Sequence, residues 1–233
     1  MRFTPNRFLL SLLVCLLAPA AHAQIDEDEL GAWYMYFFNA PFEDSQWGVQ
    51  GDVQYRNWDL LGDLEQLLIR GGVTWRPKSN DAMFTLGYAS ITTGEYGSGD
   101  STVHENRIYQ EALIPQKIGE RFYLRHRFRY EQRWVDDQDF RTRYRYALFM
   151  NVPLNQTDLG EGAWYLSMYN ELFINGQRDI GDGRSVEYFD RNRFYIAGGH
   201  SLRDNLQVQF GWMYQSTDNV GKGQMQLSLH HRF

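Results

Sequence analysis

The sequence is nearly free of cysteine and has no long hydrophobic run after its first residues. Cys15 is the only cysteine among 233 residues, and the mean hydropathy is −0.54. Without paired thiols the chain has no disulfide framework and no cysteine-ligated metal. Because no later apolar stretch reaches the roughly 20 residues that a spanning helix needs, the sequence excludes a helical membrane protein. It is compatible with a β-barrel, whose strands alternate apolar and polar residues and therefore average to a low hydropathy.

The first 23 residues have the features of a secretory signal. Arg2 and Arg7 precede an apolar run at residues 8–17, and small residues follow up to Ala23. The run is too short for a membrane anchor, so we predict cleavage after Ala23. The predicted organisation is a cleaved signal peptide at residues 1–23 and one domain at residues 24–233, since no Pro-rich or Ser-rich linker divides the remainder.

Acidic residues outnumber basic ones. The whole chain has 23 Lys and Arg against 29 Asp and Glu, a net charge of −6. Removing residues 1–23 takes away Arg2 and Arg7 and no acid, which leaves 21 against 29 and a net charge of −8. This balance argues against nucleic acid as a partner.

Residues 120–134 alternate between apolar and charged side chains. One parity carries Phe122, Leu124, Phe128, Tyr130 and Trp134, and the other carries Arg121, Arg125, Arg127, Arg129, Glu131 and Arg133. Only a period of two separates the two sets, which indicates a β-strand. On a helix the arginines would spread around the circumference and leave no apolar face to bury.

The same alternation recurs along the chain and predicts an all-β fold. We predict a single antiparallel transmembrane β-barrel of the outer-membrane type with about 10 to 12 strands. Segments can be counted at 31–38, 46–58, 64–76, 82–92, 104–114, 120–134, 140–152, 163–174, 187–200, 205–216 and 223–233. These are eleven segments, but single-chain bacterial barrels have even strand numbers, so we expect ten or twelve strands and a miscount at the weakly alternating first segment.

A soluble β-sandwich would also alternate, but two features favour the membrane barrel. Many segments run 11 to 15 residues, which suits tilted strands crossing a bilayer. Aromatic residues reach 16%, and several tryptophans stand near segment ends, where interfacial girdles lie. These are Trp47, Trp58, Trp75, Trp134 and Trp164.

The last segment resembles the signal by which bacterial outer-membrane barrels are recognised for insertion. Leu227, Leu229 and Phe233 share one parity, and the chain ends on that phenylalanine. We therefore expect export to the periplasm, contact with the barrel-assembly machinery, and insertion into the lipid of a Gram-negative outer membrane. With the C-terminus in the periplasm, residues 94–102, 136–139, 175–186 and 216–221 become extracellular, and residues 77–81, 115–119 and 203–205 become periplasmic turns. These loops are too short for a large receptor surface.

Several stretches resemble a known family. The runs at 127–133, 140–146 and 152–154 resemble a family of proteobacterial outer-membrane barrels called domain of unknown function 2490. Residues 171–175, 189–193, 195–199 and 210–215 look like that family's later strands. The resemblance implies the fold and the location, and it implies no activity.

If the aromatic parity faces lipid, the opposite parity lines the lumen. The predicted lumen residues are Arg70, Arg107, Arg127, Arg129, Glu131, Arg133, Arg141, Arg143, Arg145, Glu171, Arg191 and Arg193. Asp52, Glu105, Glu111 and Glu187 join them as carboxylates. Guanidinium groups could attract anions into such a lumen. Alternatively, arginine–carboxylate pairs could fill a narrow barrel and plug it, which is the reading we favour at this point. The function predicted is therefore a narrow or plugged channel or a structural component.

Other function classes find less support in the sequence. An outer-membrane hydrolase acting on lipid or peptide would need a nucleophile and an oriented histidine base, and His200–Ser201 and His104–Glu105 are the available pairs. We expect neither an enzyme nor a cofactor. We also expect no metal site, because His230 and His231 would point to opposite faces of a strand. A soluble periplasmic ligand-binding barrel is the third alternative, and it would be recovered in osmotic-shock fluid.

Overall fold

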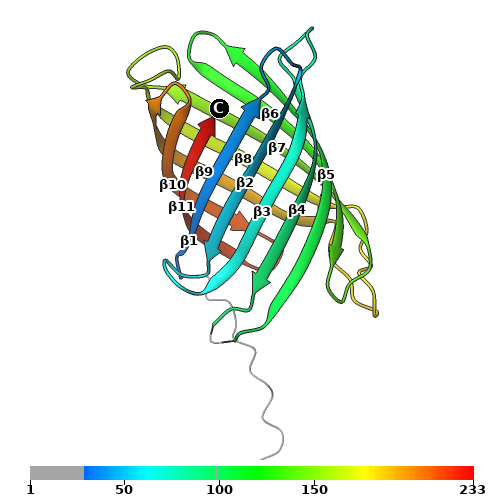
Figure 1. Cartoon of the computed structure of the whole chain (residues 1–233). Helices are drawn as coiled ribbons and strands as arrows, with labels where there is room; N and C mark the ends of the chain where they lie inside the picture. Colours follow the sequence, from blue (N-terminus) through cyan, green and yellow to red (C-terminus); the bar gives the residue numbers. More distant parts are fainter. Residues whose placement is uncertain (1–28, 98) are drawn as a thin grey trace, which may run out of the picture.

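The computed structural model describes residues 29–97 and 99–233, and within these ranges eleven strands form one closed barrel (Figure 1). The strands are β1 (Gly31–Pro41), β2 (Trp47–Asn57), β3 (Leu64–Trp75), β4 (Met83–Gly94), β5 (Thr102–Ile118), β6 (Phe122–Val135), β7 (Arg141–Pro153), β8 (Trp164–Asn175), β9 (Phe189–Arg203), β10 (Leu206–Ser216) and β11 (Gly221–Arg232). The predicted all-β barrel is confirmed. The predicted signal peptide at residues 1–23 lies outside the described residues. In the part of the chain that is described, no helix has the length and apolar character needed to cross a membrane.

The barrel closes through one parallel pair of strands. β1 lies parallel to β11, with Gly31 opposite Gln224 and Asn39 opposite Arg232, whereas all other neighbouring strands are antiparallel. The expectation of ten or twelve strands was therefore wrong, and the sheet is mixed rather than wholly antiparallel. Closure requires only that the first and last strands hydrogen-bond to each other, and a parallel ladder satisfies that requirement. The weakly alternating first segment is a complete strand, paired with β2 on its other side.

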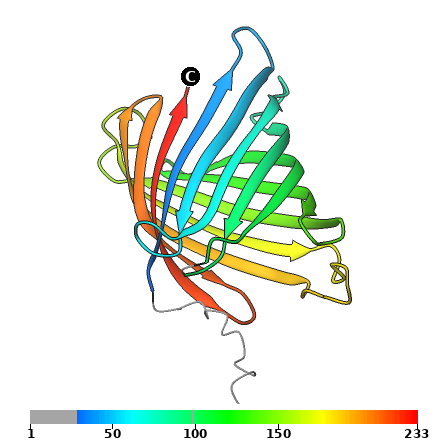
Figure 2. The same ribbon diagram turned by 60° about the horizontal axis from the view of Figure 1, so that its bottom comes forward.

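The odd strand number places the two ends of the described chain at opposite ends of the barrel (Figures 1 and 2). We call one end the N-terminal mouth: it holds the start of β1 and the connections at 58–63, 95–101, 136–140, 176–188 and 217–220. The other end is the C-terminal mouth, with Phe233 and the connections at 42–46, 76–82, 119–121, 154–163 and 204–205. In Figure 1 the C-terminal mouth is at the top.

Strand β5 is longer than its sequence segment. A turn was expected at residues 115–119, but Pro115 continues the strand and pairs with Arg125 of β6. On the other side, β4 begins at Met83, opposite Leu113, so it no longer runs beside Pro115. The missing proline N–H is tolerated because no neighbour on that side requires it. The turn shortens to residues 119–121, where Gly119 adopts a φ of 57°.

The polarity of the barrel is inverted relative to a soluble protein. Arg129 and Glu131 are 6% and 1% exposed on the inner face. On the outer face, Leu86, Tyr144 and Phe210 are 61%, 55% and 58% exposed. Charged residues are otherwise seldom fully buried, and soluble proteins seldom expose large aromatic and aliphatic side chains around a whole surface. The alternation along each strand therefore sorts charge inward and apolar area outward.

Aromatic side chains extend this apolar surface to both mouths. Trp47, Trp75 and Trp164 lie exposed at the C-terminal mouth, and Trp134 lies exposed at the N-terminal mouth. Trp58 differs from the prediction of an outward girdle residue, since it lines the interior and meets the Tyr96 ring edge-on at 5.7 Å. It stands in the turn after β2, where the alternation of the strand no longer determines the direction of the side chain.

Candidate functional site

The lumen contains a cavity of about 1010 Å³. Its lining reaches the N-terminal mouth at Val135 and Thr217 and the C-terminal mouth at Asp204 and Arg232. The inward side chains therefore leave space along the barrel, and the lumen is the candidate functional site.

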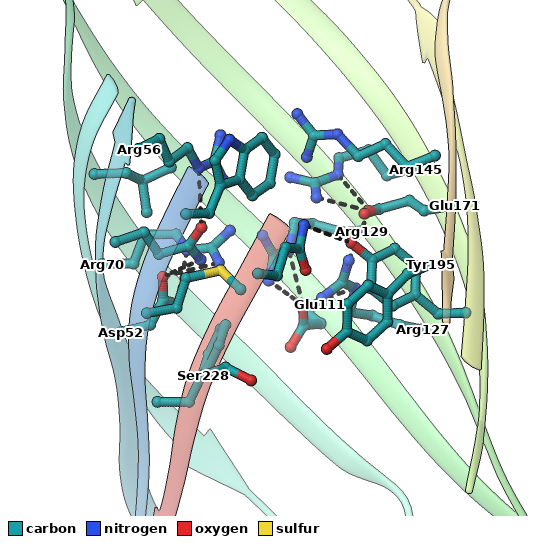
Figure 3. Close-up of a pocket in the computed structure, with 18 of the residues that line it drawn as sticks. Asp52, Arg56, Arg70, Glu111, Arg127, Arg129, Arg145, Glu171, Tyr195 and Ser228 are labelled. Carbon is teal, nitrogen blue, oxygen red and sulfur yellow. Dashed lines mark hydrogen bonds and ion pairs between the residues drawn. The ribbon is translucent and has the colours of Figure 1, made fainter. Parts of the chain in front are cut away.

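The structure places the twelve predicted lumen residues on the inner face. Eleven of these twelve, all described, line the cavity: Arg70, Arg107, Arg127, Arg129, Arg133, Arg141, Arg143, Arg145, Glu171, Arg191 and Arg193. Glu131 lies behind them, 1% exposed. Figure 3 shows labelled residues from both walls: Asp52, Arg56 and Arg70 on one side, and Glu111, Arg127, Arg129, Arg145 and Glu171 on the other.

Glu131 organises the wall formed by β6 and β7. Its Oε2 accepts hydrogen bonds from Nε and Nη2 of Arg143, at 2.9 and 2.7 Å, and its Oε1 accepts one from Arg145 Nη1 at 2.7 Å. Arg107 and Arg129 approach the same carboxylate at 3.8 and 3.9 Å. One fully buried carboxylate thus holds guanidinium groups from three strands, β5, β6 and β7.

Two further carboxylates continue this network toward the C-terminal mouth. Glu171 of β8 accepts hydrogen bonds from Arg127 Nη2 at 2.6 Å and from Arg145 Nε at 2.8 Å. Glu111 of β5 accepts one from Arg129 Nε at 2.7 Å and another from the Gln50 side chain at 3.1 Å. Charge-assisted bonds of this length are strong and directional, so they hold the arginine side chains against the wall.

Similar arginine–carboxylate pairs lie toward the N-terminal mouth and on the opposite wall of the lumen. Glu105 accepts hydrogen bonds from both Arg107 and Arg133. On β2 and β3, Arg70 donates Nε and Nη2 to the two oxygens of Asp52, at 2.8 and 3.0 Å. This two-pronged geometry suits guanidinium and carboxylate groups and fixes both side chains.

The carboxylates do not balance the cations of the lumen. Among the described residues, the cavity is lined by fourteen arginines and Lys222, fifteen cations, and by seven carboxylates. Adding Glu131 and Asp190, which pair with these arginines from behind, gives nine acids against fifteen cations. The lumen therefore carries six excess positive charges, although the whole chain has a net charge of −6.

The sequence analysis missed an aromatic and arginine group on the wall of β1 and β2. Trp33 is 2% exposed and points inward, and the Arg56 guanidinium lies 3.8 Å from the centre of its ring. Trp33 packs with Tyr195 and Met213 in a buried cluster. Arg56 shares the polar parity of β2, which could have identified it. Trp33 had no such signal, because apolar residues occupy both faces of β1.

Glu187 was expected in the lumen, and the structure contradicts this. Its side chain is 60% exposed in the connection between β8 and β9, where it pairs with Arg178 at 2.7 Å. β9 begins only at Phe189, so Glu187 precedes the strand and its position in the sequence does not fix its face.

The histidine pairs considered for a hydrolase are held in other contacts. Ser201 donates its hydroxyl to the Leu159 carbonyl at 2.8 Å, and His200 Nδ1 lies 3.2 Å from the Ala163 carbonyl. His104 Nδ1 lies 3.1 Å from the Thr92 hydroxyl on the exposed outer side. Within residues 29–97 and 99–233, no three His, Cys, Asp or Glu side chains are grouped to hold a metal ion.

Comparison with known proteins gives one match. A family model described as a protein of unknown function (DUF2490) matches residues 30–226. No curated protein and no solved structure matches the chain.

Proposed function

We propose that this chain, which belongs to the family of proteins of unknown function (DUF2490), is an outer-membrane β-barrel whose narrow, arginine-rich lumen admits small anions. The observation that carries the proposal is the sorting of charge. Fifteen cations, among the described residues, face a cavity with seven carboxylates in its lining, while the outer face is apolar. The family supplies no activity, so the proposal depends on the geometry of this chain.

The outer face supports the membrane location. Each strand has 11 to 17 residues in the described chain, and about 9 to 11 residues suffice for a tilted strand to cross a bilayer. Apolar side chains such as Leu86 and Phe210 are costly to expose to water but are stable in contact with lipid chains, and tryptophans at both mouths suit the headgroup region. A soluble periplasmic barrel would instead need a polar exterior, so this alternative fits the structure less well.

The proposed orientation follows from the C-terminal strand. Placing the C-terminal mouth in the periplasm turns the N-terminal mouth outward, with its longer connections at 95–101 and 176–188. The same orientation puts the first described residues, Glu29 and Leu30, on the outer side of the membrane. An even-stranded barrel would have returned them to the periplasm.

The charge of the lumen supports anion entry, and its ion pairs limit the size of the solute. Guanidinium groups suit carboxylate and phosphate oxygens, and a ring of cationic side chains favours anions in a pore. The pairs centred on Glu131, Glu171 and Glu111 hold many of the arginines against one wall, so space remains beside them. We therefore favour a narrow pathway over a structural plug.

Planar-bilayer recording tests the proposal. The protein without residues 1–23 is refolded and inserted, and its reversal potential is measured under a KCl gradient at low and high ionic strength. We expect anion-selective steps at both. The two ionic strengths separate the lumen from the rim, because salt screens exposed rim carboxylates such as Asp182, whose side chain is 86% exposed, more than it screens charges inside the lumen. Cation selectivity, or silence of folded and inserted protein, would refute the pathway. Silence would favour the plugged barrel instead.

A further inference from the structure

The arginines of the lumen fall into two classes by their partners. Most have a carboxylate within 4 Å: Arg70, Arg107, Arg127, Arg129, Arg133, Arg143, Arg145 and Arg191. Among the described residues, Arg56, Arg141 and Arg193 are buried, at 6%, 9% and 7% exposed, and have no carboxylate within 4 Å. Burying a guanidinium without a direct counter-charge is costly, so these three invite an explanation, and two of them share one aromatic ring.

Arg56 and Arg193 converge on the same indole ring. Their guanidinium carbons lie 3.8 and 4.9 Å from the centre of the Trp33 ring. Arg193 also lies 4.8 Å from the centre of the Phe173 ring, and Phe173 is 1% exposed. Guanidiniums and rings therefore alternate in the order Arg56 on β2, Trp33 on β1, Arg193 on β9 and Phe173 on β8. The strands β10 and β11, which lie between β1 and β9 in the sheet, contribute none of these four side chains.

The hydrogen bonds of both arginines go to neutral groups. Arg56 donates to the side-chain oxygens of Gln54 and Gln66, and Arg193 donates Nε to Gln215 at 2.7 Å. In the described part of the chain, the two Nη groups of Arg193 make no hydrogen bond. Amide oxygens satisfy N–H donors but carry no full negative charge to pair with the guanidinium.

The acids around these two arginines are bonded to other groups. Glu65 accepts hydrogen bonds from the Trp33 indole at 2.8 Å and from the Gln224 side chain at 3.2 Å. Glu171, opposite Arg193 in the pairing of β8 with β9, accepts its hydrogen bonds from Arg127 and Arg145. The Glu65 carboxylate thus fixes the ring that both arginines contact and forms no ion pair within 4 Å with either of them. The ring is held in place, and neither cation has a direct acidic partner among the described residues.

The contacts with the rings leave N–H groups of both guanidiniums for a ligand. In the described chain Arg193 donates only through Nε, and Arg56 uses three of its five N–H groups on Gln54 and Gln66. A carboxylate or phosphate can accept two N–H groups from one guanidinium. Both arginines line the cavity, so an ion in the lumen can reach them. We infer that Arg56 and Arg193, positioned by Trp33 and Phe173, form a binding site for a small oxyanion, with a carboxylate or phosphate group between or beside the two guanidiniums. This site deepens the proposed anion function and rests on it for its route of access.

Titration calorimetry of the folded protein in detergent, with inorganic phosphate as the probe, measures the site without requiring conduction. We expect phosphate to bind the unchanged protein, and Arg193→Gln to weaken its affinity by about tenfold or more, because charge-assisted bonds are lost. Arg56→Gln should do the same. Folding of each variant is checked by heat-modifiable electrophoretic mobility.

Arg125→Gln is the matched control. Arg125 lines the same cavity near the C-terminal mouth, has no carboxylate within 4 Å in the described chain, and lies 5.4 Å from the centre of the Phe149 ring. The Arg125→Gln substitution removes one lumen charge but leaves Arg56, Arg193 and the Trp33 ring unchanged. The phosphate affinity of this variant should therefore stay within about twofold of that of the unchanged protein. Equal losses in Arg125→Gln and Arg193→Gln would overturn a discrete site in favour of general attraction.

The outcomes separate the site from the pathway. Phosphate binding that depends on Arg193 in a protein that conducts nothing would keep the site and refute the pathway. Anion-selective conduction without measurable phosphate binding would keep the pathway and refute the site. Absence of both would refute the two together.

Discussion

Glu131 Oε1 lies 2.7 Å from Arg145 Nη1, and the glutamate is 1% exposed. The two residues come from neighbouring strands, β6 and β7, and the same glutamate also holds Arg143 at 2.7 Å. A carboxylate that is removed from water is stable only when its partners satisfy it, and two guanidiniums do so here. Glu131 therefore contributes more to the stability of this wall of the lumen than an exposed ion pair does.

Replacing this carboxylate should destabilise the barrel. Glu131→Gln removes the negative charge that Arg143 and Arg145 share, and breaking a buried pair costs about 3 to 5 kcal/mol. The free energy of unfolding in urea, measured in lipid vesicles, should fall by about this amount. Glu187→Gln removes an exposed pair with Arg178 and should cost under about 1 kcal/mol. Equal effects of the two variants would contradict the burial of Glu131.

Reversing one lumen charge should change ion preference or folding. Arg129→Glu would place a carboxylate beside Glu111, which now accepts a hydrogen bond from Arg129 at 2.7 Å. Repulsion between the two acids should lower the denaturant midpoint, and protein that still folds should lose anion preference in the bilayer. Tyr130→Phe, on the outer parity, should change neither. If Arg129→Glu left both the midpoint and the reversal potential unchanged, Arg129 would not face the lumen.

Closure through the parallel pair can be tested by cross-linking. Tyr34 of β1 lies opposite Leu227 of β11, both on the outer face. The double variant Tyr34→Cys with Leu227→Cys should cross-link readily under oxidation, because adjacent strands are about 4.8 Å apart. Phe210 of β10 lies opposite Leu227 on its other side, so it is two strands away from Tyr34. The double variant Tyr34→Cys with Phe210→Cys is therefore the control and should cross-link poorly. Failure of the first pair would mean that β1 does not close the barrel.

The odd strand number predicts that the start of β1 and the end of β11 lie on opposite sides of the membrane. A protease site inserted before Leu30 should be cut in intact cells, as should one inserted within residues 176–188 at the same mouth. A site within residues 154–163, at the C-terminal mouth, should be cut only after the outer membrane is permeabilised. Protection of the site before Leu30 in intact cells, with cleavage at 176–188, would indicate an even-stranded barrel.

Alternation in the sequence predicts strands and faces well wherever both parities differ in chemistry. Phe128 is 49% exposed on the outer face and its neighbour Arg129 is 6% exposed on the inner face, as their parity indicates. The eleven segments in the sequence each correspond to one strand of the described chain. The residues of a strand alone decide which of its faces is charged and which is apolar, so this property can be predicted from a single sequence.

Three features lay beyond the sequence. The expected even strand number was wrong, because the alternation within a strand says nothing about how the first and last strands pair. The partners of each arginine were also hidden: Arg127 binds Glu171, which is 44 residues away, through a register that only the folded sheet defines. Trp33 was missed because β1 carries apolar residues on both faces, so its inward direction left no mark in the pattern.

The central claim is that lipid covers the outer face of the barrel and water fills the lumen. Leu227 and Ser228 are consecutive residues of β11, 43% and 2% exposed, on the outer and inner faces. Since Cys15 is the only cysteine and falls in the predicted signal, Leu227→Cys and Ser228→Cys can each carry a single nitroxide label in vesicles. We predict that oxygen, which concentrates in lipid, relaxes the label at 227 more than a water-soluble nickel chelate does, and that the order reverses at 228. A label at 227 that prefers the nickel chelate would contradict the account, because it would place the apolar face of the barrel in water.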